Sequence, residues 1–125
     1  MKPDYSLYLV TDRMLMSTRT LGEAVGQAVS GGCTLVQLRE KDISSLDFYA
    51  LALEIKMITD SYGIPLIIND RIDIAMAAGA AGVHIGQNDI PADIARKVIG
   101  KYMLLGVSVS SAAEAVNAAE AGADY

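Results

Sequence analysis

Short apolar runs alternate with amphipathic stretches along the whole of this 125-residue chain. The apolar runs are a few residues long and end in polar or charged residues, as short buried strands do. The longer stretches between them have helix-stop glycines at or near their ends. The pattern predicts strands at residues 7–10, 34–38, 65–68, 82–85 and 103–107. It predicts helices at residues 21–30, from 44 to about 62, 72–78, from 91 to 100 and from 110 or 111 to about 121, with 123–125 opening a sixth strand.

Strict alternation of strand and helix predicts an α/β fold with parallel strands joined by right-handed crossovers. The strands are almost entirely apolar, as expected when both faces of a sheet are covered. Two architectures fit this pattern, a doubly wound sheet and a (β/α)₈ barrel. A complete barrel needs roughly 200 or more residues, so 125 residues hold only part of one. The repeated unit and the absence of a linker predict a single domain.

Composition narrows the class of protein. The chain is 52% hydrophobic and 20% charged, which is typical of a globular domain. A net charge of −5 without a cluster of lysine and arginine argues against nucleic-acid or membrane-surface binding. No apolar run approaches the roughly 18 residues of a membrane span. A single cysteine cannot form an internal disulfide, so a cytoplasmic location is expected.

Polar residues follow four successive predicted strands, at the end where α/β proteins place their sites. Gln37 and Arg39 share one face of their strand because side chains alternate with a period of two. Asp70 and Asp89 follow two successive strands, one strand–helix unit apart. The residues expected to converge are Gln37, Arg39, Lys41, Asn69, Asp70, Asp89 and Ser108, with His84 and Gln87 beside them.

The residue types indicate a site for a metal diphosphate. Arg39 and Lys41 supply positive charge for an anion such as phosphate. Asp70 and Asp89 supply oxygen ligands of the kind that hold Mg²⁺ together with substrate phosphates and water. The remaining polar residues, which could orient phosphates or a neutral ring by hydrogen bonds, are Gln37, Asn69 and Ser108. No Ser-His-Asp or Cys-His arrangement and no GxGxxG or Walker A loop is evident, so covalent catalysis has little support.

Each feature also has a purely structural interpretation. The segment 69–71 alone is typical of a turn and helix cap, and Asp89 ahead of Pro91 is a good N-cap. Residues 39–42 alone are typical of a solvated loop with local ion pairs, which stabilise little. His84 in an apolar strand is as compatible with the core as with a site. The convergence of four strand ends of compatible chemistry favours function.

Six segments, in order and at matching spacing, carry a family resemblance. They are LYLVTDR (7–13), GGCTLVQLREKD (31–42), PLIINDRIDIA (65–75), GVHIGQNDIP (82–91), LLGVSVSS (104–111) and EAGADY (120–125). Through them the chain resembles the thiamine-phosphate synthases over essentially its whole length. The QLREK, INDR and HIGQ-x-D segments together are specific, whereas any one alone is weak.

The resemblance implies a (β/α)₈ TIM barrel and a known reaction class. Those enzymes join hydroxymethylpyrimidine diphosphate to hydroxyethylthiazole phosphate, releasing pyrophosphate and forming thiamine phosphate. It implies that Asp70 and Asp89 hold Mg²⁺ and that Ser108 contacts the pyrimidine substrate. It also implies diphosphate-binding residues, of which the two cations would stabilise the leaving group: Gln37, Arg39, Lys41 and Asn69.

The resemblance further implies that residues 1–125 form one partial barrel domain of about five βα units that lacks the family's C-terminal strands. We therefore expect this chain alone not to make thiamine phosphate at normal rates, and we expect self-association through exposed barrel edges. Other readings are a thiazole tautomerase-like relative, a non-catalytic phosphate-binding scaffold, or another phosphate-handling barrel enzyme. The combined REK, IND and Q-x-D segments favour the synthase.

Overall fold

The computed structural model describes residues 2–125 and consists there of alternating strands and helices, as the pattern predicts. The strands are β1 (Tyr8–Val10), β2 (Leu35–Leu38), β3 (Leu66–Asn69), β4 (Gly82–Ile85) and β5 (Leu104–Val107). The helices are α1 (Leu21–Ser30), α2 (Ser45–Ser61), α3 (Ile72–Ala78), α4 (Ala92–Ile99) and α5 (Ala112–Glu120). The bounds of α1, α3 and β4 are those predicted, and the bounds of the other elements differ from the predicted ones by one or two residues at an end.

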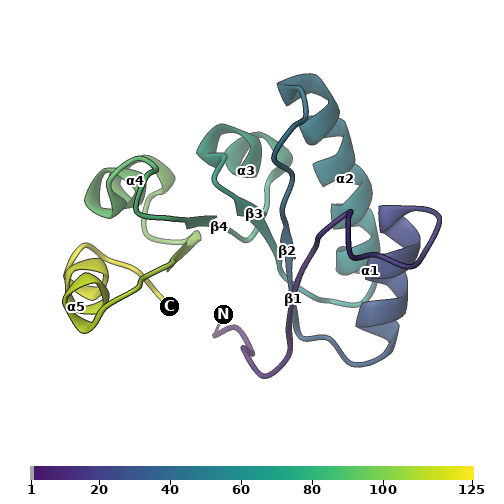
Figure 1. Cartoon of the computed structure of the whole chain (residues 1–125), viewed down its shortest axis with the longest axis horizontal. Coiled ribbons are helices and arrows are strands. Elements are labelled where there is room, and N and C mark those ends of the chain that lie inside the picture. Colours follow the sequence, from purple (N-terminus) through teal and green to yellow (C-terminus); the bar gives the residue numbers. More distant parts are fainter. Residues whose placement is uncertain (1) are drawn as a thin grey trace.

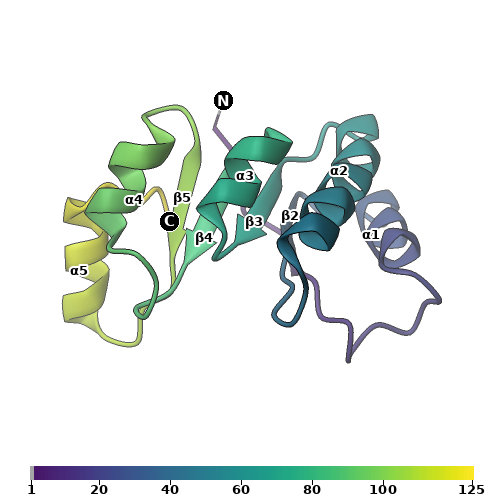
Figure 2. The ribbon, with the colours of Figure 1, turned by 90° about the horizontal axis from the view of Figure 1, so that it is seen from above.

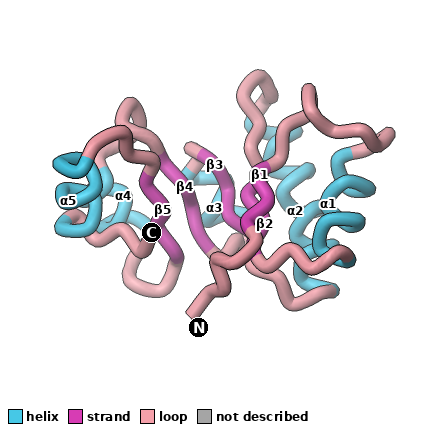
Figure 3. Tube along the Cα trace, turned by 60° about the horizontal axis from the view of Figure 1, so that its bottom comes forward, coloured by secondary structure: helices cyan, strands magenta, loops and turns pink. Residues whose placement is uncertain are grey.

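The strands form one parallel sheet in the order β1-β2-β3-β4-β5. Figure 1 shows the helices following one another around the outer side of the curved sheet in chain order, with both termini on the opposite side. The view from above in Figure 2 and the trace in Figure 3 show the same division between strands inside and helices outside. Consecutive parallel pairing places all carboxyl ends of the strands at one edge.

The hydrophobic core lies between the sheet and its helices. Strand residues that face the helices, such as Val36 and Leu38, are fully buried against helix residues such as Phe48 and Ile55. Leu35 is equally buried but lies outside this core cluster, on the inner face of the sheet. Period-two alternation therefore separates a helix-facing core from an inner face that continues into Gln37. No helix within residues 2–125 has the length and apolar character needed to cross a bilayer.

Serine and threonine side chains cap three helices. Thr20 accepts a hydrogen bond from the backbone of Glu23, and Ser44 does the same for Asp47. Ser111, rather than Ser110, caps α5. Each cap satisfies a backbone N–H that has no partner inside its helix.

Residues 123–125, predicted to open a sixth strand, run beside β5 and are hydrogen-bonded to it, although the described strands end with β5. The backbone N–H of Asp124 donates to Leu105 at 2.7 Å, and the carbonyl of Tyr125 accepts from Val107 at 3.0 Å. The guanidinium of Arg96 on α4 donates to the carbonyl of Gly122 and to the carboxylate of Asp124. These contacts fix the segment that carries Tyr125.

Gly82 on β4 is expected to tolerate no side chain. A Cβ there would lie 2.5 Å from the carbonyl oxygen of Leu104 on the neighbouring strand, and that backbone cannot move without breaking the pairing. We predict that Gly82→Ala lowers the free energy of unfolding by roughly 1–3 kcal/mol, measured by urea denaturation. Gly26→Ala is the matched control, because a Cβ in α1 meets nothing within 4 Å. It should instead raise stability by about 0.5–1 kcal/mol, and equal effects would contradict the packing argument.

Candidate functional site

A pocket of about 330 Å³ opens beyond the carboxyl ends of β2, β3, β4 and β5, and we call it the strand-end pocket. Every predicted site residue except Gln37 lines it. The lining residues are Arg39, Lys41, Asn69, Asp70, His84, Gly86, Gln87, Asn88, Asp89 and Ser108. Residues from four separate βα connections thus share one pocket because the strands are parallel and adjacent.

Asp70 occupies a backbone conformation that its side chain does not favour. Its φ is +65°, and within residues 2–125 no other residue except glycine has a positive φ. Its backbone N–H donates to the carbonyl of His84 at 2.8 Å, which ties the end of β3 to β4. Its carboxylate lies 2.5 Å from the ammonium of Lys41. Aspartate adopts this conformation more readily than most residues, but at some cost.

The interpretation of Asp70 and Asp89 as helix caps is wrong. The N-cap position of α3 is Arg71 and that of α4 is Pro91, and neither helix has a side-chain cap bond. Asp89 instead accepts a hydrogen bond from the backbone N–H of Gly86 at 2.7 Å, inside its own turn. Both carboxylates are therefore held at the pocket without serving a helix end.

Asn69 at the end of β3 presents an unpaired donor to the same pocket. The residue is 6% exposed, and its Nδ2 is buried without a hydrogen-bond partner in the part of the chain that the structure describes. A buried amide without a partner costs free energy. An anion or another acceptor in the pocket would remove that cost.

The cations come from the loop after β2. The backbone of Arg39 donates to the hydroxyl of Thr11, which anchors the loop to the end of β1. Glu40, whose side chain is buried, pairs with Arg13 at 2.7 Å. Because the ion pairs of this loop reach Arg13 and Asp70, the interpretation of residues 39–42 as a loop with only local ion pairs is wrong.

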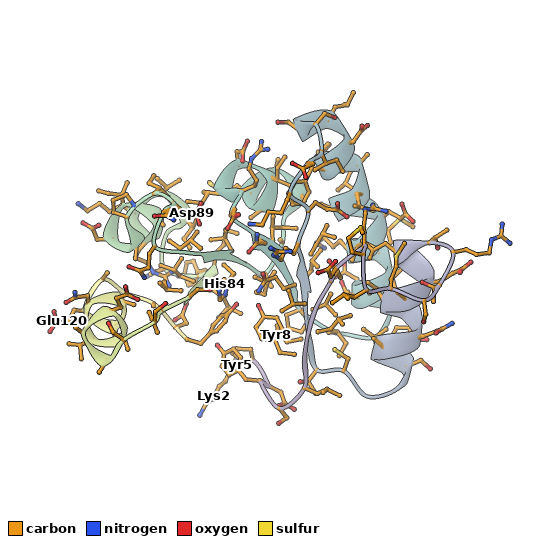
Figure 4. The ribbon with its side chains drawn as sticks, in the orientation of Figure 1. Lys2, Tyr5, Tyr8, His84, Asp89 and Glu120 are labelled. Atoms are coloured by element: carbon orange, nitrogen blue, oxygen red, sulfur yellow. The ribbon has the colours of Figure 1, made fainter. Side chains whose placement is uncertain are left out.

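Gln37 lies deeper than the pocket, on the inner face of the sheet. Its amide donates to the hydroxyl of Tyr8 at 3.1 Å, and that hydroxyl lies 2.6 Å from the hydroxyl of Tyr125. His84 lines the pocket and also lies near the interior tyrosines, since its Nδ1 is 3.3 Å from the Tyr125 hydroxyl. In the view of Figure 4 it lies between Asp89 and Tyr8. Its Nε2 lies 2.7 Å from the hydroxyl of Ser108.

Tyr8 and Tyr125 are the site-associated residues that sequence reasoning missed. In the one-dimensional pattern both resemble core aromatic residues at strand positions, because nothing there pairs residue 8 with residue 125. The sequence is compatible with either the core or the site for His84, and its contacts place it at the boundary of the two.

The oxygen donors of the strand-end pocket fit a metal ion only if a bound ligand supplies further donors. Within residues 2–125 no group of three or more histidine, cysteine or acidic side chains converges to hold an ion. Asp70 and Asp89 provide two hard carboxylates on neighbouring βα connections. Mg²⁺ is commonly held by one or two carboxylates, with phosphate oxygens and water completing its shell. The set therefore fits Mg²⁺ together with a phosphate compound.

Comparisons with known proteins agree on one family. A family model described as thiamine monophosphate synthase matches residues 7–125. The chain is 67% identical over 127 residues to the thiamine-phosphate synthase of Clostridium beijerinckii, covering all of this chain and 61% of that protein. It is 64% identical over 124 residues to that of Ruminiclostridium cellulolyticum, covering 99% and 59%. The structure of thiamine phosphate pyrophosphorylase from Pyrococcus furiosus matches with a TM-score of 0.88 and 35% identity, covering 95% of this chain and 57% of that one.

The chain thus spans about three-fifths of the length of the relatives it matches. The likeness in structure confirms the predicted barrel family over the five βα units present. The roles expected of individual site residues stay predictions.

The stability of the chain should fall on acidification because of His84, its only histidine. Burial lowers the pKa of His84 in the folded chain, against the opposing effect of Asp70 and Asp89. The unfolded chain then binds the proton at higher pH, so stability is full above about pH 6.5 and is lost as pH falls toward the folded pKa. We predict a loss below about 1.4 kcal/mol per pH unit, the limit for one group. Urea denaturation between pH 7.5 and 5.5 measures it, and His84→Gln should flatten the profile; an unchanged slope would contradict the assignment.

Proposed function

This chain belongs to the thiamine monophosphate synthase family, and from that premise we propose that it binds a pyrimidine diphosphate with Mg²⁺ for the synthesis of thiamine phosphate. The second substrate is a thiazole phosphate, and pyrophosphate is the leaving group. The single observation that carries the proposal is the content of the strand-end pocket. It combines two cations, two carboxylates that cap no helix, and a buried amide donor without a partner.

The strand-end pocket matches the charge of a diphosphate. Arg39 and Lys41 would neutralise phosphate oxygens, and the Nδ2 of Asn69 would donate to one of them. Lys41 now pairs with Asp70 across partly exposed surface, an interaction worth about 0–1 kcal/mol. A diphosphate can therefore compete for the ammonium at small cost. Ser108, exposed at the rim, would contact the same ligand.

The proposed reaction needs no protein nucleophile. The carbon–oxygen bond of the pyrimidine diphosphate breaks, its electron pair leaves with pyrophosphate, and the thiazole nitrogen then bonds to the pyrimidine methylene carbon. Arg39 and Lys41 would stabilise the negative charge that grows on the leaving group. Gln37, on the inner face, would help to orient the pyrimidine substrate.

Asp70 and Asp89 are the residues that would hold Mg²⁺. The ion, when bound, would supply charge neutralisation of the leaving pyrophosphate. The strained backbone of Asp70 fits this role, because backbone strain at a residue that caps nothing is typical of functional sites.

The chain spans about three-fifths of the length of its relatives. The part of the reaction proposed for it is therefore the binding of the diphosphate and of the metal ion. We propose that residues 1–125 act as one partial barrel domain in the cytoplasm, with self-association at β1 and at the segment 123–125, which runs beside β5. A tautomerase-like role explains the strand-end pocket less well, because a proton shift needs no metal diphosphate site. A passive phosphate-binding scaffold would not require both carboxylates.

Binding of Mg²⁺-pyrophosphate to this chain tests the proposal by isothermal titration calorimetry. We expect saturable binding that needs the metal, and a loss of affinity of at least tenfold in Asp70→Asn and in Asp89→Asn. Asparagine is used because it tolerates a positive φ, so Asp70→Asn removes charge without new backbone strain.

Asp93→Asn is the matched control, because Asp93 lies in the first turn of α4, is exposed and does not line the strand-end pocket. It makes the same change of charge and should bind as the unmodified chain does. Metal-independent binding that survives both pocket substitutions would leave only the scaffold reading. Size-exclusion chromatography of each variant reports whether self-association changes the result.

A further inference from the structure

A continuous series of hydrogen bonds crosses the inner face of the sheet and ends at the strand-end pocket. The amide of Gln37 on β2 lies 3.1 Å from the hydroxyl of Tyr8 on β1, which lies 2.6 Å from that of Tyr125. The Tyr125 hydroxyl lies 3.3 Å from Nδ1 of His84 on β4. The other ring nitrogen, Nε2, lies 2.7 Å from the hydroxyl of Ser108 beyond β5. We call this series the Gln37–Ser108 relay.

One direction of donation gives each tyrosine hydrogen of the relay an acceptor. The Nε2 of Gln37 can only donate, so the Tyr8 oxygen accepts from it. Either hydroxyl could donate in the bond between Tyr8 and Tyr125. If Tyr125 donated, the Tyr8 hydrogen would have no acceptor among the hydrogen bonds of the described residues, so Tyr8 is assigned as the donor. The one Tyr125 hydrogen then goes to Nδ1 of His84. A neutral imidazole carries one N–H, which is thereby placed on Nε2 and donates to Ser108. The hydrogen of the Ser108 hydroxyl is left free.

The surroundings keep each member in the state that this direction requires. Burial raises the pKa of the Tyr8 hydroxyl and of the Tyr125 hydroxyl, so both stay protonated and able to donate. The acceptor role of Nδ1 toward the Tyr125 hydroxyl corresponds to a ring with a single N–H.

The fold also reserves space for the contact between Tyr125 and His84. A Cβ at Gly106 on β5 would lie 2.3 Å from Cζ of Tyr125 and 2.4 Å from Nδ1 of His84. Only a glycine at this position lets the tyrosine hydroxyl approach the ring. The rings of Tyr5 and Tyr125 pack at 5.0 Å between centroids, so Tyr5 supports the ring without joining the relay. Figure 4 shows Tyr5 and Tyr8 on the side toward which His84 points.

We propose that Tyr125 is a positioning residue that, backed by Tyr8 and Gln37, holds His84 as its Nε2–H tautomer so that Ser108 presents its hydroxyl hydrogen to a bound phosphate group. The proposal rests on the proposed function for its ligand, a diphosphate in the strand-end pocket. The opposite tautomer would make Nε2 an acceptor and consume the hydrogen of Ser108. The relay therefore decides whether the serine donates to the anion or meets it with a lone pair.

The tautomer can be measured directly because the chain has one histidine. Long-range ¹H–¹⁵N spectra of the uniformly labelled chain at pH 7.5 should show a protonated Nε2 and an unprotonated Nδ1. In Tyr125→Phe the signals should move toward a mixture of tautomers, and the dissociation constant for inorganic pyrophosphate with Mg²⁺ should rise roughly 3- to 10-fold, the effect of one hydrogen bond. Tyr5→Phe removes a hydroxyl from a neighbouring ring outside the relay and should change neither reading.

The possible outcomes distinguish failure of the Gln37–Ser108 relay from failure of the proposed function. A protonated Nδ1 in the unmodified chain would overturn the proposal without any variant, and so would a tautomer unchanged in Tyr125→Phe. Tyr8→Phe, which breaks the relay one step earlier and keeps the ring packing, gives the same test if Tyr125→Phe fails to fold. Weaker pyrophosphate binding in Ser108→Ala with normal binding in Tyr125→Phe would overturn the relay and leave the proposed function standing. Absence of pyrophosphate binding in the unmodified chain would overturn the proposed function and the role of Ser108. The ¹H–¹⁵N spectra would still test whether His84 is the Nε2–H tautomer.

Discussion

Parallel pairing of neighbouring strands is the constraint on which the rest of this structure depends. Each strand is joined to the next through a helix, and the register places Asn69 beside His84 and His84 beside Gly106. Because all strands run in one direction, the polar residues that follow them reach one edge. The strand-end pocket is a consequence of that pairing, since its residues come from connections far apart in the chain.

The two faces of the sheet differ in polarity and in what they contact. The outer face packs apolar side chains against the helices and forms the hydrophobic core. The inner face begins with Leu35 and Ile67 and then becomes polar toward the carboxyl ends, where Gln37 and Asn69 are buried. Buried polar groups are tolerated when they are hydrogen-bonded. Gln37 meets this condition through Tyr8, whereas the Nδ2 of Asn69 does not, which marks the place where a ligand would be stabilised.

Alternating apolar runs were sufficient to predict the element order, the parallel sheet and the barrel family. The same pattern located the strand ends, so it brought together the pocket residues from Arg39 to Ser108. It was wrong about helix capping: Asp70 and Asp89 have the residue types and positions of caps, yet α3 and α4 begin after Arg71 and Pro91. Capping depends on the local backbone angles, and composition alone does not reveal the positive φ of Asp70.

The sequence by itself determined the repeating strand–helix unit, the separation of an apolar core from polar strand ends, and the charge and donor chemistry of the pocket. Those features follow from residue type and period, which are local properties. Only the tertiary structure decided that Lys41 pairs with Asp70, that Asp89 turns back to Gly86, and that Tyr8 meets Tyr125. Such contacts join residues whose proximity depends on sheet curvature and strand register. Neither property can be predicted from the order of residues along one strand.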